Sequence, residues 1–329
     1  KEPFRFVPIP SVARMRHPWL LKQIEKAREF SETSPLNFTE GSGELGIITS
    51  GVSYNYVKEA LLEMNISAEI LKLGITHPIP EKKIIEFLQR HKRVIVVEEL
   101  EAFLETHARR LAHLNNVSVD ILGKEQGYFS RVGEFSPRNV IEVLCKIDNC
   151  NTPINWQDID TRSATIQELP PRPPLLCAGC PHRASYYAIR AATRGKAIYP
   201  SDIGCYTLSI APPLETADIL FDMGSSITTA CGLSEVTDQD VVATIGDSTF
   251  FASGLPGIVD AVYNQHRICL VVLDNRTTAM TGHQPHPGTG MTGMRKEVPP
   301  LDIEDVCKGL GVKYVKTVYP FESIAGLVA

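Results

Sequence analysis

Short apolar segments alternate with longer amphipathic segments between residues 41 and 150. The short segments have the length of buried strands, and the longer ones repeat apolar residues at helical spacing. The predicted strands are 44–51, 68–73, 93–97 and 117–122, and the predicted helices are 54–64, 80–91 and 100–115. Strands that alternate with helices in this way favour a parallel sheet with helices on its faces. The sequence therefore predicts an α/β domain over residues 41–150.

The second half of the chain repeats this alternation after an interruption. Residues 151–174 lack the pattern and end in a proline-rich run from 170 to 174, which is typical of a stiff extended linker. Beyond it, the predicted strands are 217–222, 241–245 and 268–273, and the predicted helices are 186–193, 226–233 and 259–265. We therefore expect two three-layer α/β domains with mainly parallel sheets, the second over residues 175–329. Residues 1–40 are assigned to an entry segment with a helical pattern over 17–30.

Charge and hydropathy exclude two classes of partner. Lysine and arginine total 33 against 38 acidic residues, so the chain has no basic field for nucleic-acid phosphates. Its apolar stretches are much shorter than the roughly 20 residues of a membrane span, so we expect neither nucleic acid nor membrane. The eight cysteines are sparse for 329 residues, which favours a reducing, cytoplasmic location. The chain begins at Lys1 without an initiator methionine, which favours a piece of a longer protein.

Two polar segments follow neighbouring predicted strands of the second domain. Gly246-Asp247-Ser248 ends the strand 241–245, and Asp274-Asn275 ends the strand 268–273. The helix between them is a right-handed crossover, so both segments emerge at the same edge of the sheet, where ligands of open α/β sheets bind. A carboxylate and an amide oxygen are hard ligands suited to Mg²⁺, which is commonly held together with substrate phosphates. The alternative is ordinary turn chemistry, because Asp and Asn are common at strand ends.

Small residues at the start of a predicted helix could contribute to the same site. Gly224, Ser225 and Ser226 follow the strand 217–222 and open the helix. Backbone N–H groups at a helix start bind phosphates, so this segment is expected to contact a diphosphate.

A pair of cysteines separated by two residues also requires an explanation. Cys177-Ala178-Gly179-Cys180 lets both sulfur atoms turn toward one metal or one redox partner. Cys269 lies within an apolar strand and is expected to be a small buried hydrophobic residue. The Glu98-Glu99 pair after the strand 93–97 is interpreted as solvated acids, with a partner contact as the alternative.

These motifs together resemble a known family. Gly246-Asp247-Ser248 followed by Asn275 is similar to the thiamine-diphosphate motif, with Ser248 where the family usually has glycine. Cys177 and Cys180 with Cys205, and the segment 274–284, resemble 2-oxoacid:ferredoxin oxidoreductases. Within that family the segments 176–183, 201–206 and 223–226 are most similar to the alpha subunits of the enzymes that act on indolepyruvate. The resemblance spans residues 41–329.

The resemblance carries expectations about fold and activity. It implies a transketolase C-terminal-like domain over 41–150, followed by a thiamine-diphosphate-binding fold. It implies an enzyme that oxidatively decarboxylates indolepyruvate and other aryl 2-oxoacids to acyl-CoA and CO₂, with ferredoxin as electron acceptor. The implied partners are a beta subunit, ferredoxin, coenzyme A and the 2-oxoacid, in a higher oligomer. The alternatives are a pyruvate-type enzyme, a nonoxidative thiamine-dependent decarboxylase, or a fragment that is inactive by itself.

The resemblance also assigns residues. It implies Mg²⁺ ligands at the side chains of Asp247 and Asn275 and at the backbone carbonyl of Thr277. Cys177, Cys180 and Cys205 are three ligands of a 4Fe-4S cluster or, as the alternative, an inert set near the thiamine. Downstream candidates for a fourth cluster ligand are Cys231, Cys269 and Cys307. The expected cofactor-binding residues are Gly246, Asp247, Ser248, Asn275, Thr277, Gly224, Ser225 and Cys205.

No residue is assigned the role of activating the cofactor. In the family this is a Glu on a pyrimidine-binding domain, which is expected to lie outside this chain, as is a ferredoxin-like cluster domain. His182 and His283 are weak candidates for proton transfer, because an unperturbed imidazole titrates near neutral pH. His286 is interpreted as a loop residue that forms local hydrogen bonds.

Overall fold

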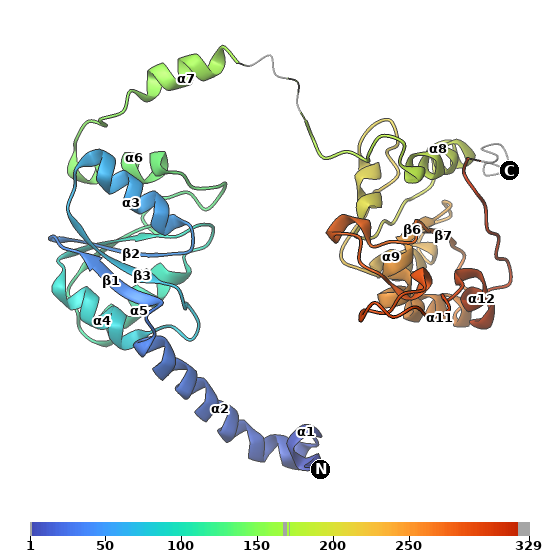
Figure 1. Cartoon of the computed structure of the whole chain (residues 1–329), viewed down its shortest axis with the longest axis horizontal. Helices are drawn as coiled ribbons and strands as arrows, with labels where there is room; N and C mark the ends of the chain where they lie inside the picture. Colours follow the sequence, from blue (N-terminus) through green and yellow to red (C-terminus); the bar gives the residue numbers. More distant parts are fainter. Residues whose placement is uncertain (1, 167–169, 171, 322–329) are drawn as a thin grey trace. The chain divides into compact units, whose positions relative to one another are not determined.

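The computed structural model describes residues 2–166, 170 and 172–321, so Pro171 of the predicted proline run lies outside the described residues. The chain divides into two compact units, Lys1–Leu169 and Pro170–Ala329. Both units place helices around a parallel or mostly parallel sheet (Figure 1), as the sequence predicts. Within the described ranges, no helix is both long and apolar enough to cross a membrane.

The first unit is built on a five-stranded sheet. Its strands are β1 (Asn37–Gly41), β2 (Leu45–Ser50), β3 (Ala68–Leu73), β4 (Arg93–Val97) and β5 (Asp120–Leu122). Their order is β1-β3-β2-β4-β5, and every pair is parallel except β1 with β3. The crossover helices are α3 (Ser53–Met64), α4 (Glu81–Arg90) and α5 (Phe103–Leu114), and α6 (Pro137–Asp148) follows β5. The sheet is therefore mixed, with one antiparallel edge strand.

Alternate residues of the central strands face opposite layers of helices. Ile47 and Ile95 pack against α3 and α6, whereas Ile48 and Val96 pack against α4 and α5. Figure 1 shows these two helix pairs on the two sides of the sheet. Because the strands are covered on both faces, nearly all their side chains are buried, which explains the continuous apolar runs in the sequence.

The ends of the first unit differ from the expected entry segment and linker. Residues 1–40 form α1 (Pro3–Phe6), α2 (Pro10–Thr33) and most of β1, so the first strand begins before residue 41. The side chain of Asn37 anchors the first residue of this strand: its Nδ2 donates to Ser31 O at 2.9 Å, and its Oδ1 accepts from Gly74 N and Ile75 N. Periodicity missed β1 because the strand lacks apolar alternation and is defined by its antiparallel pairing with β3.

The predicted linker contains a helix, α7 (Trp156–Ala164). Arg138 of α6 makes a bidentate ion pair with Asp160 of α7, with N–O distances of 2.7 and 3.1 Å. The Arg138 guanidinium also lies 5.0 Å from the centre of the Trp156 ring. These contacts attach α7 to α6, so residues 156–164 are not an extended spacer.

The second unit has a smaller sheet. Strands β6 (Val242–Gly246) and β7 (Cys269–Leu273) are parallel, with Gly246 opposite Leu273. Isolated parallel bridges join Ile198 to Val241 and Pro200 to Ile219, which extends the hydrogen-bonded layer. The predicted strand at 217–222 is thus reduced to a single bridge residue in the structure. Cys269 is exposed at the start of β7, so the expectation that it is buried was wrong: β7 has a partner on one side only.

Helices cover both faces of this layer. They are α8 (Pro181–Thr193), α9 (Ser225–Ser234), α10 (Asp247–Thr249), α11 (Leu255–Tyr263) and α12 (Ile303–Gly309). Ile245 packs in a core cluster with residues of α9, α11 and α12. On the other face, Tyr186 of α8 places its hydroxyl 3.3 Å from Thr244 Oγ1. The shorter helical segments are η1 (Cys205–Ile210), η2 (Phe250–Gly254), η3 (Ala279–Thr281) and η4 (Pro287–Thr289).

The acidic pair after β4 caps local structure. Glu98 is buried, and its carboxylate accepts hydrogen bonds from Leu104 N at 2.7 Å and Glu105 N at 3.0 Å, at the start of α5. Glu99 accepts from Phe135 N at 3.0 Å. Burial raises the pKa of Glu98, and the two backbone hydrogen bonds partly oppose that rise. The interpretation of this pair as solvated acids was therefore wrong.

Replacing Glu98 with alanine is expected to destabilise the first unit by about 1 to 2 kcal/mol, because two N–H groups at the start of α5 lose their acceptor. Urea unfolding followed by tryptophan fluorescence measures this, since Trp19 and Trp156 both lie in the first unit. Glu101→Ala is the matched control, because Glu101 is exposed. Equal stability of the two variants would contradict the capping role.

Candidate functional site

Three polar turns meet at the carboxyl edge of the second unit's sheet. The segment 198–200 pairs parallel with the residues around β6, and β6 pairs parallel with β7. Asp202 follows the first segment, Asp247 follows β6, and Asp274 and Asn275 follow β7. Because parallel strands end on the same side, these residues share one edge, where ligands of open α/β sheets bind.

Gly246 shapes this edge by allowing a close contact. A Cβ atom at Gly246 would lie 2.4 Å from Cε1 of Tyr206, and one at Gly204 would lie 2.3 Å from the same atom. The ring is held in place because its hydroxyl lies 2.7 Å from Ile203 O and 3.2 Å from Thr249 Oγ1. Burial raises the pKa of Tyr206 to about 12, so the hydroxyl is neutral at physiological pH. Glycine at position 246 is therefore a packing requirement.

Asp247 is a buried carboxylate with one unsatisfied oxygen. Its Oδ1 accepts from Ser248 N at 2.7 Å, but its Oδ2 has no hydrogen-bond partner among the described residues. Burial raises the pKa of Asp247, and the neighbouring Asp274 raises it further, while His286 and the Ser248 N–H oppose the rise. An unsatisfied buried carboxylate oxygen is costly unless a cation approaches it.

His286 faces this carboxylate from a loop beyond β7. Its Nε2 lies 3.0 Å from Asp247 Oδ2, although the two atoms are not aligned for a hydrogen bond. Its Nδ1 accepts from Gly288 N at 3.2 Å, so a neutral ring carries its proton on Nε2. The ring also stacks on Phe251, with 6.0 Å between ring centroids. The expected local hydrogen bond is therefore present, but the contact with Asp247 was missed, because no sequence spacing links the two residues.

Asn275 and Thr277 lie where the sequence predicts oxygen ligands. Asn275 Oδ1 accepts only a 3.3 Å hydrogen bond from Thr277 N. Thr278 Oγ1 donates to Ser248 Oγ at 2.8 Å, which ties the loop after β7 to the turn after β6. A carboxylate, an amide oxygen and a backbone carbonyl form a donor set of the kind that Mg²⁺ prefers. The chemistry of these donors suits a magnesium ion: Oδ2 of Asp247 has no partner among the described residues, and the Thr277 carbonyl accepts one hydrogen bond, from Ala279 N at 3.0 Å.

The start of α9 differs from the expected phosphate contact. Gly224 N donates to both carboxylate oxygens of Asp202, at 2.8 and 2.9 Å, and Ser226 N donates to Oδ2 at 3.2 Å. Ser225 N donates to Asp222 O at 3.3 Å. The N–H groups proposed for phosphates are thus bonded within the chain. Asp202 lies in the segment 201–206, but the sequence alone did not indicate that it binds the start of α9.

The structure brings the three predicted cluster cysteines into one neighbourhood. Cys177 is exposed, and Cys180 and Cys205 are half-buried in the same apolar cluster. Burial raises the pKa of the Cys205 thiol, and the charges of the nearby Cys180 and Cys177 raise it further. Their sulfur atoms are not all within 4.8 Å of one another, as the ligands of a single metal ion would be. Cys231 and Cys307, candidates for a fourth ligand, lie in a different core cluster.

The two histidines proposed for proton transfer have different surroundings. His182 is buried at the start of α8, with its ring edge-to-face with Tyr206 and 6.3 Å between centroids. Burial lowers the pKa of His182, which keeps the ring neutral. His283 is exposed, has φ of 62°, and places Nδ1 3.4 Å from Thr277 Oγ1.

Comparisons with known proteins show what the chain is similar to. Residues 202–329 match the family model described as thiamine pyrophosphate enzyme, C-terminal TPP binding domain. The chain is 44% identical to the indolepyruvate oxidoreductase subunit IorA of Pyrococcus horikoshii, over 98% of this chain and 52% of that protein. It is 43% identical to the IorA subunit of Methanothermobacter thermautotrophicus, over 97% of this chain and 52% of that protein.

The chain thus spans about half the length of the curated relatives it matches, 52% in both cases. Among solved structures, a 2-oxoglutarate:ferredoxin oxidoreductase from Magnetococcus marinus is 21% identical, with a TM-score of 0.38, over 44% of this chain and 54% of that chain.

The buried position of His182 predicts a pH dependence. Because its pKa in the folded protein lies below the ordinary value of 6.5, the unfolded chain binds the proton more readily. Its contribution to stability is complete above pH 6.5 and is lost as the pH falls toward the folded-state pKa. Wild type should therefore lose stability relative to His182→Gln between pH 7.5 and 5.5, by at most about 1.4 kcal/mol per pH unit. Urea unfolding followed by circular dichroism tests this, and a pH-independent difference between the two proteins would contradict it.

Proposed function

We propose that the chain binds Mg-thiamine diphosphate as part of an aryl-2-oxoacid oxidoreductase. Residues 202–329 match the model of the C-terminal TPP binding domain of thiamine pyrophosphate enzymes, and the chain is similar to indolepyruvate oxidoreductase subunits along almost its whole length. The reaction is the oxidative decarboxylation of indolepyruvate and related acids to acyl-CoA and CO₂. The observation that carries the proposal is the buried, unsatisfied Oδ2 of Asp247 beside the segment 274–277.

Each residue of this edge has a proposed role in holding the cofactor. Asp247 and Asn275 bind Mg²⁺ through their side chains, and Thr277 binds it through its backbone carbonyl. Gly246 lets Tyr206 pack against the end of β6, and Ser248 holds the loop after β7 through Thr278. The thiamine, when bound, supplies the carbanion chemistry that decarboxylates a 2-oxoacid, while the protein binds and orients it.

Gly224 and Ser225 have a different role from the one their position predicts. Since Asp202 accepts the hydrogen bonds of Gly224 N and Ser226 N, we assign this turn to shaping the cofactor edge. Gly224 has φ of 95°, and a Cβ there would lie 2.7 Å from Ser253 Oγ. Substitution at Gly224 would therefore move the start of α9 rather than remove one ligand.

We propose that the first unit is a transketolase C-terminal-like domain and that ferredoxin, a beta subunit and coenzyme A complete the reaction in a higher oligomer. Cys177, Cys180 and Cys205 would ligate part of a 4Fe-4S cluster, which would supply a one-electron path away from the cofactor edge. The shared apolar neighbourhood of Cys180 and Cys205 supports this assignment.

The cofactor site is tested by calorimetric titration of thiamine diphosphate into the protein with Mg²⁺. Asp247→Ala and Asn275→Ala should each weaken binding at least roughly tenfold, because each removes an oxygen ligand of the metal. Asp238→Ala is the matched control, since Asp238 is an exposed aspartate of the same unit. If Asp247→Ala and Asn275→Ala bind thiamine diphosphate as tightly as wild type and the Asp238→Ala control do, the proposed ligand set is wrong.

The cysteine assignment is tested by anaerobic reconstitution with iron and sulfide. Wild type should take up iron and acid-labile sulfide with a visible absorption band, and Cys177→Ser and Cys205→Ser should each reduce iron content. Cys150→Ser is the control, because Cys150 is an exposed cysteine of the first unit. Iron content that is unaffected by the Cys177 and Cys205 substitutions would refute the cluster.

Ferredoxin reduction by the full complex, assayed with indolepyruvate and pyruvate, then decides between the aryl and pyruvate-type activities.

A further inference from the structure

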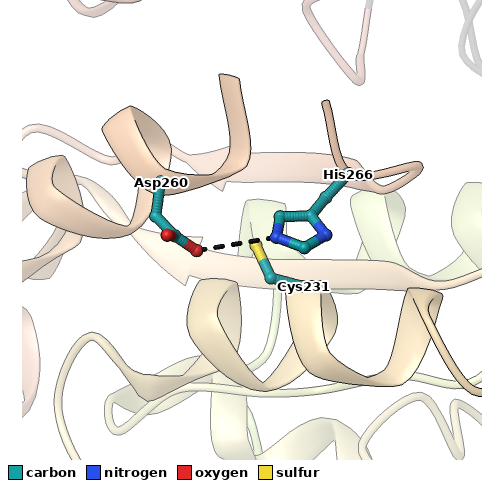
Figure 2. Close-up of side chains that lie close together, drawn as sticks. All are labelled: Cys231, Asp260 and His266. Carbon is teal, nitrogen blue, oxygen red and sulfur yellow. Dashed lines mark ion pairs between the residues drawn. The ribbon is translucent and has the colours of Figure 1, made fainter. Parts of the chain in front are cut away.

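A second group of potential metal ligands lies away from the cofactor edge. Cys231 comes from α9, Asp260 from α11, and His266 from the turn between α11 and β7. One ligand atom of each lies within 4.8 Å of the others, and Figure 2 shows the three side chains converging on one point. Among the described residues this is the only such group of three. It sits near the ends of α9 and α11 and before β7 begins, whereas the cofactor edge lies where β6 and β7 end.

The imidazole of His266 is oriented by a carboxylate outside this group. His266 Nδ1 lies 2.9 Å from Glu235 Oε1, which places the ring proton on Nδ1 when the ring is neutral. Nε2 then has its lone pair directed toward Asp260, whose Oδ2 is 3.7 Å away (Figure 2). A histidine that binds a metal through one nitrogen commonly donates its other N–H to a carboxylate in this way.

The third group is a buried sulfur. Cys231 is 3% exposed and belongs to the core cluster between α9, α11 and α12. Burial raises the pKa of the Cys231 thiol to about 11, and the charges of Asp260 and Glu235 contribute to that rise. The thiol therefore stays protonated in the apoprotein. A divalent cation would favour the thiolate and offset the charge of the two carboxylates.

We propose that Cys231 Sγ, a carboxylate oxygen of Asp260 and Nε2 of His266 bind one zinc-type divalent cation, with Glu235 holding the imidazole from outside the coordination shell. Sulfur and imidazole ligands select Zn²⁺ over Mg²⁺, which prefers oxygen ligands only. Three protein ligands leave the fourth position of a tetrahedral ion to water. The bound ion joins α9 to α11 on the face of β6 that their core cluster covers.

A simpler arrangement uses the same residues without a metal. A protonated His266 would make ion pairs with Glu235 and Asp260, and Cys231 would be an ordinary buried thiol. That arrangement predicts no metal uptake at this position and no dependence of metal binding on Cys231. The two possibilities therefore differ in a measurable way.

The test is a titration of the chelator-stripped protein with Co²⁺, which reports thiolate ligation by a charge-transfer absorption band. Because Cys177, Cys180 and Cys205 also offer thiols, the measurement is the number of Co²⁺ ions lost on substitution. Cys231→Ser and His266→Gln should each bind one ion fewer than wild type. Cys307→Ser should bind as wild type does, since Cys307 is also buried in the same core cluster but lies outside the group.

Two further measurements separate metal loss from misfolding. Zn²⁺ should displace the Co²⁺ and raise the thermal midpoint of wild type by more than that of His266→Gln, which lacks this site. Glu235→Gln keeps all three ligands, so it should retain the ion with affinity reduced roughly tenfold to a hundredfold. The proposal is overturned if stripped wild type takes up no Co²⁺, or if Cys231→Ser and His266→Gln take up as many ions as wild type. Neither result bears on thiamine binding, which depends on the opposite edge.

Discussion

The parallel pairing of the segment 198–200, β6 and β7 determines where polar groups collect in the second unit. Parallel strands linked by crossovers all end on one side, so the turns after them cannot be distributed over the surface. The close contact between Gly246 and Tyr206 then brings the turn after β6 against the segment before η1. A side chain at position 246 would separate these two segments, and the buried groups that follow them would lose their shared environment.

Two buried aspartates at this edge differ in how their carboxylate oxygens are hydrogen-bonded. Asp202 is fully buried and accepts hydrogen bonds from the N–H groups of Gly224 and Ser226, so helix α9 satisfies its charge. Asp247 is almost as buried, yet its Oδ2 has no hydrogen-bond partner among the described residues, although Nε2 of His286 lies 3.0 Å away. A buried oxygen without a partner is tolerated when a bound ligand supplies the interaction that the chain does not provide. The contrast between Asp202 and Asp247 therefore supports a structural role for the first and a binding role for the second.

The sequence predicted the features that depend on local patterns and missed those that depend on tertiary contacts. Apolar periodicity located β2, β3, β4, β6 and β7, but it did not predict the parallel bridges at 198 and 200. Asp247 and Asn275 follow β6 and β7, as the sequence pattern predicts. Strand β1 was missed because Phe38 is its one large apolar residue, and its pairing with β3 leaves no periodic signal in the sequence. The contact of His286 with Asp247 and that of Asp202 with the start of α9 were also missed, because the two partners of each contact are distant in the sequence. The N–H groups of Gly224 and Ser226, which we expected to face a phosphate, donate to Asp202 in this structure, because a helix start attracts any nearby anion, including one from the same chain.

The two edges of the second unit differ in the kind of cation their atoms select. At the carboxyl edge the candidate donors are all oxygens, from Asp247, Asn275 and Thr277, which suits a hard ion that keeps water or phosphate in its shell. At the opposite edge a single carboxylate meets a sulfur and an imidazole nitrogen. Nitrogen and sulfur ligands bind zinc-type ions more tightly than Mg²⁺. The types of ligand atom at each edge therefore determine which of the two ions that edge prefers. Removing the sulfur of Cys231 would therefore weaken the preference for a zinc-type ion at one edge and leave the oxygen ligands of the other unchanged.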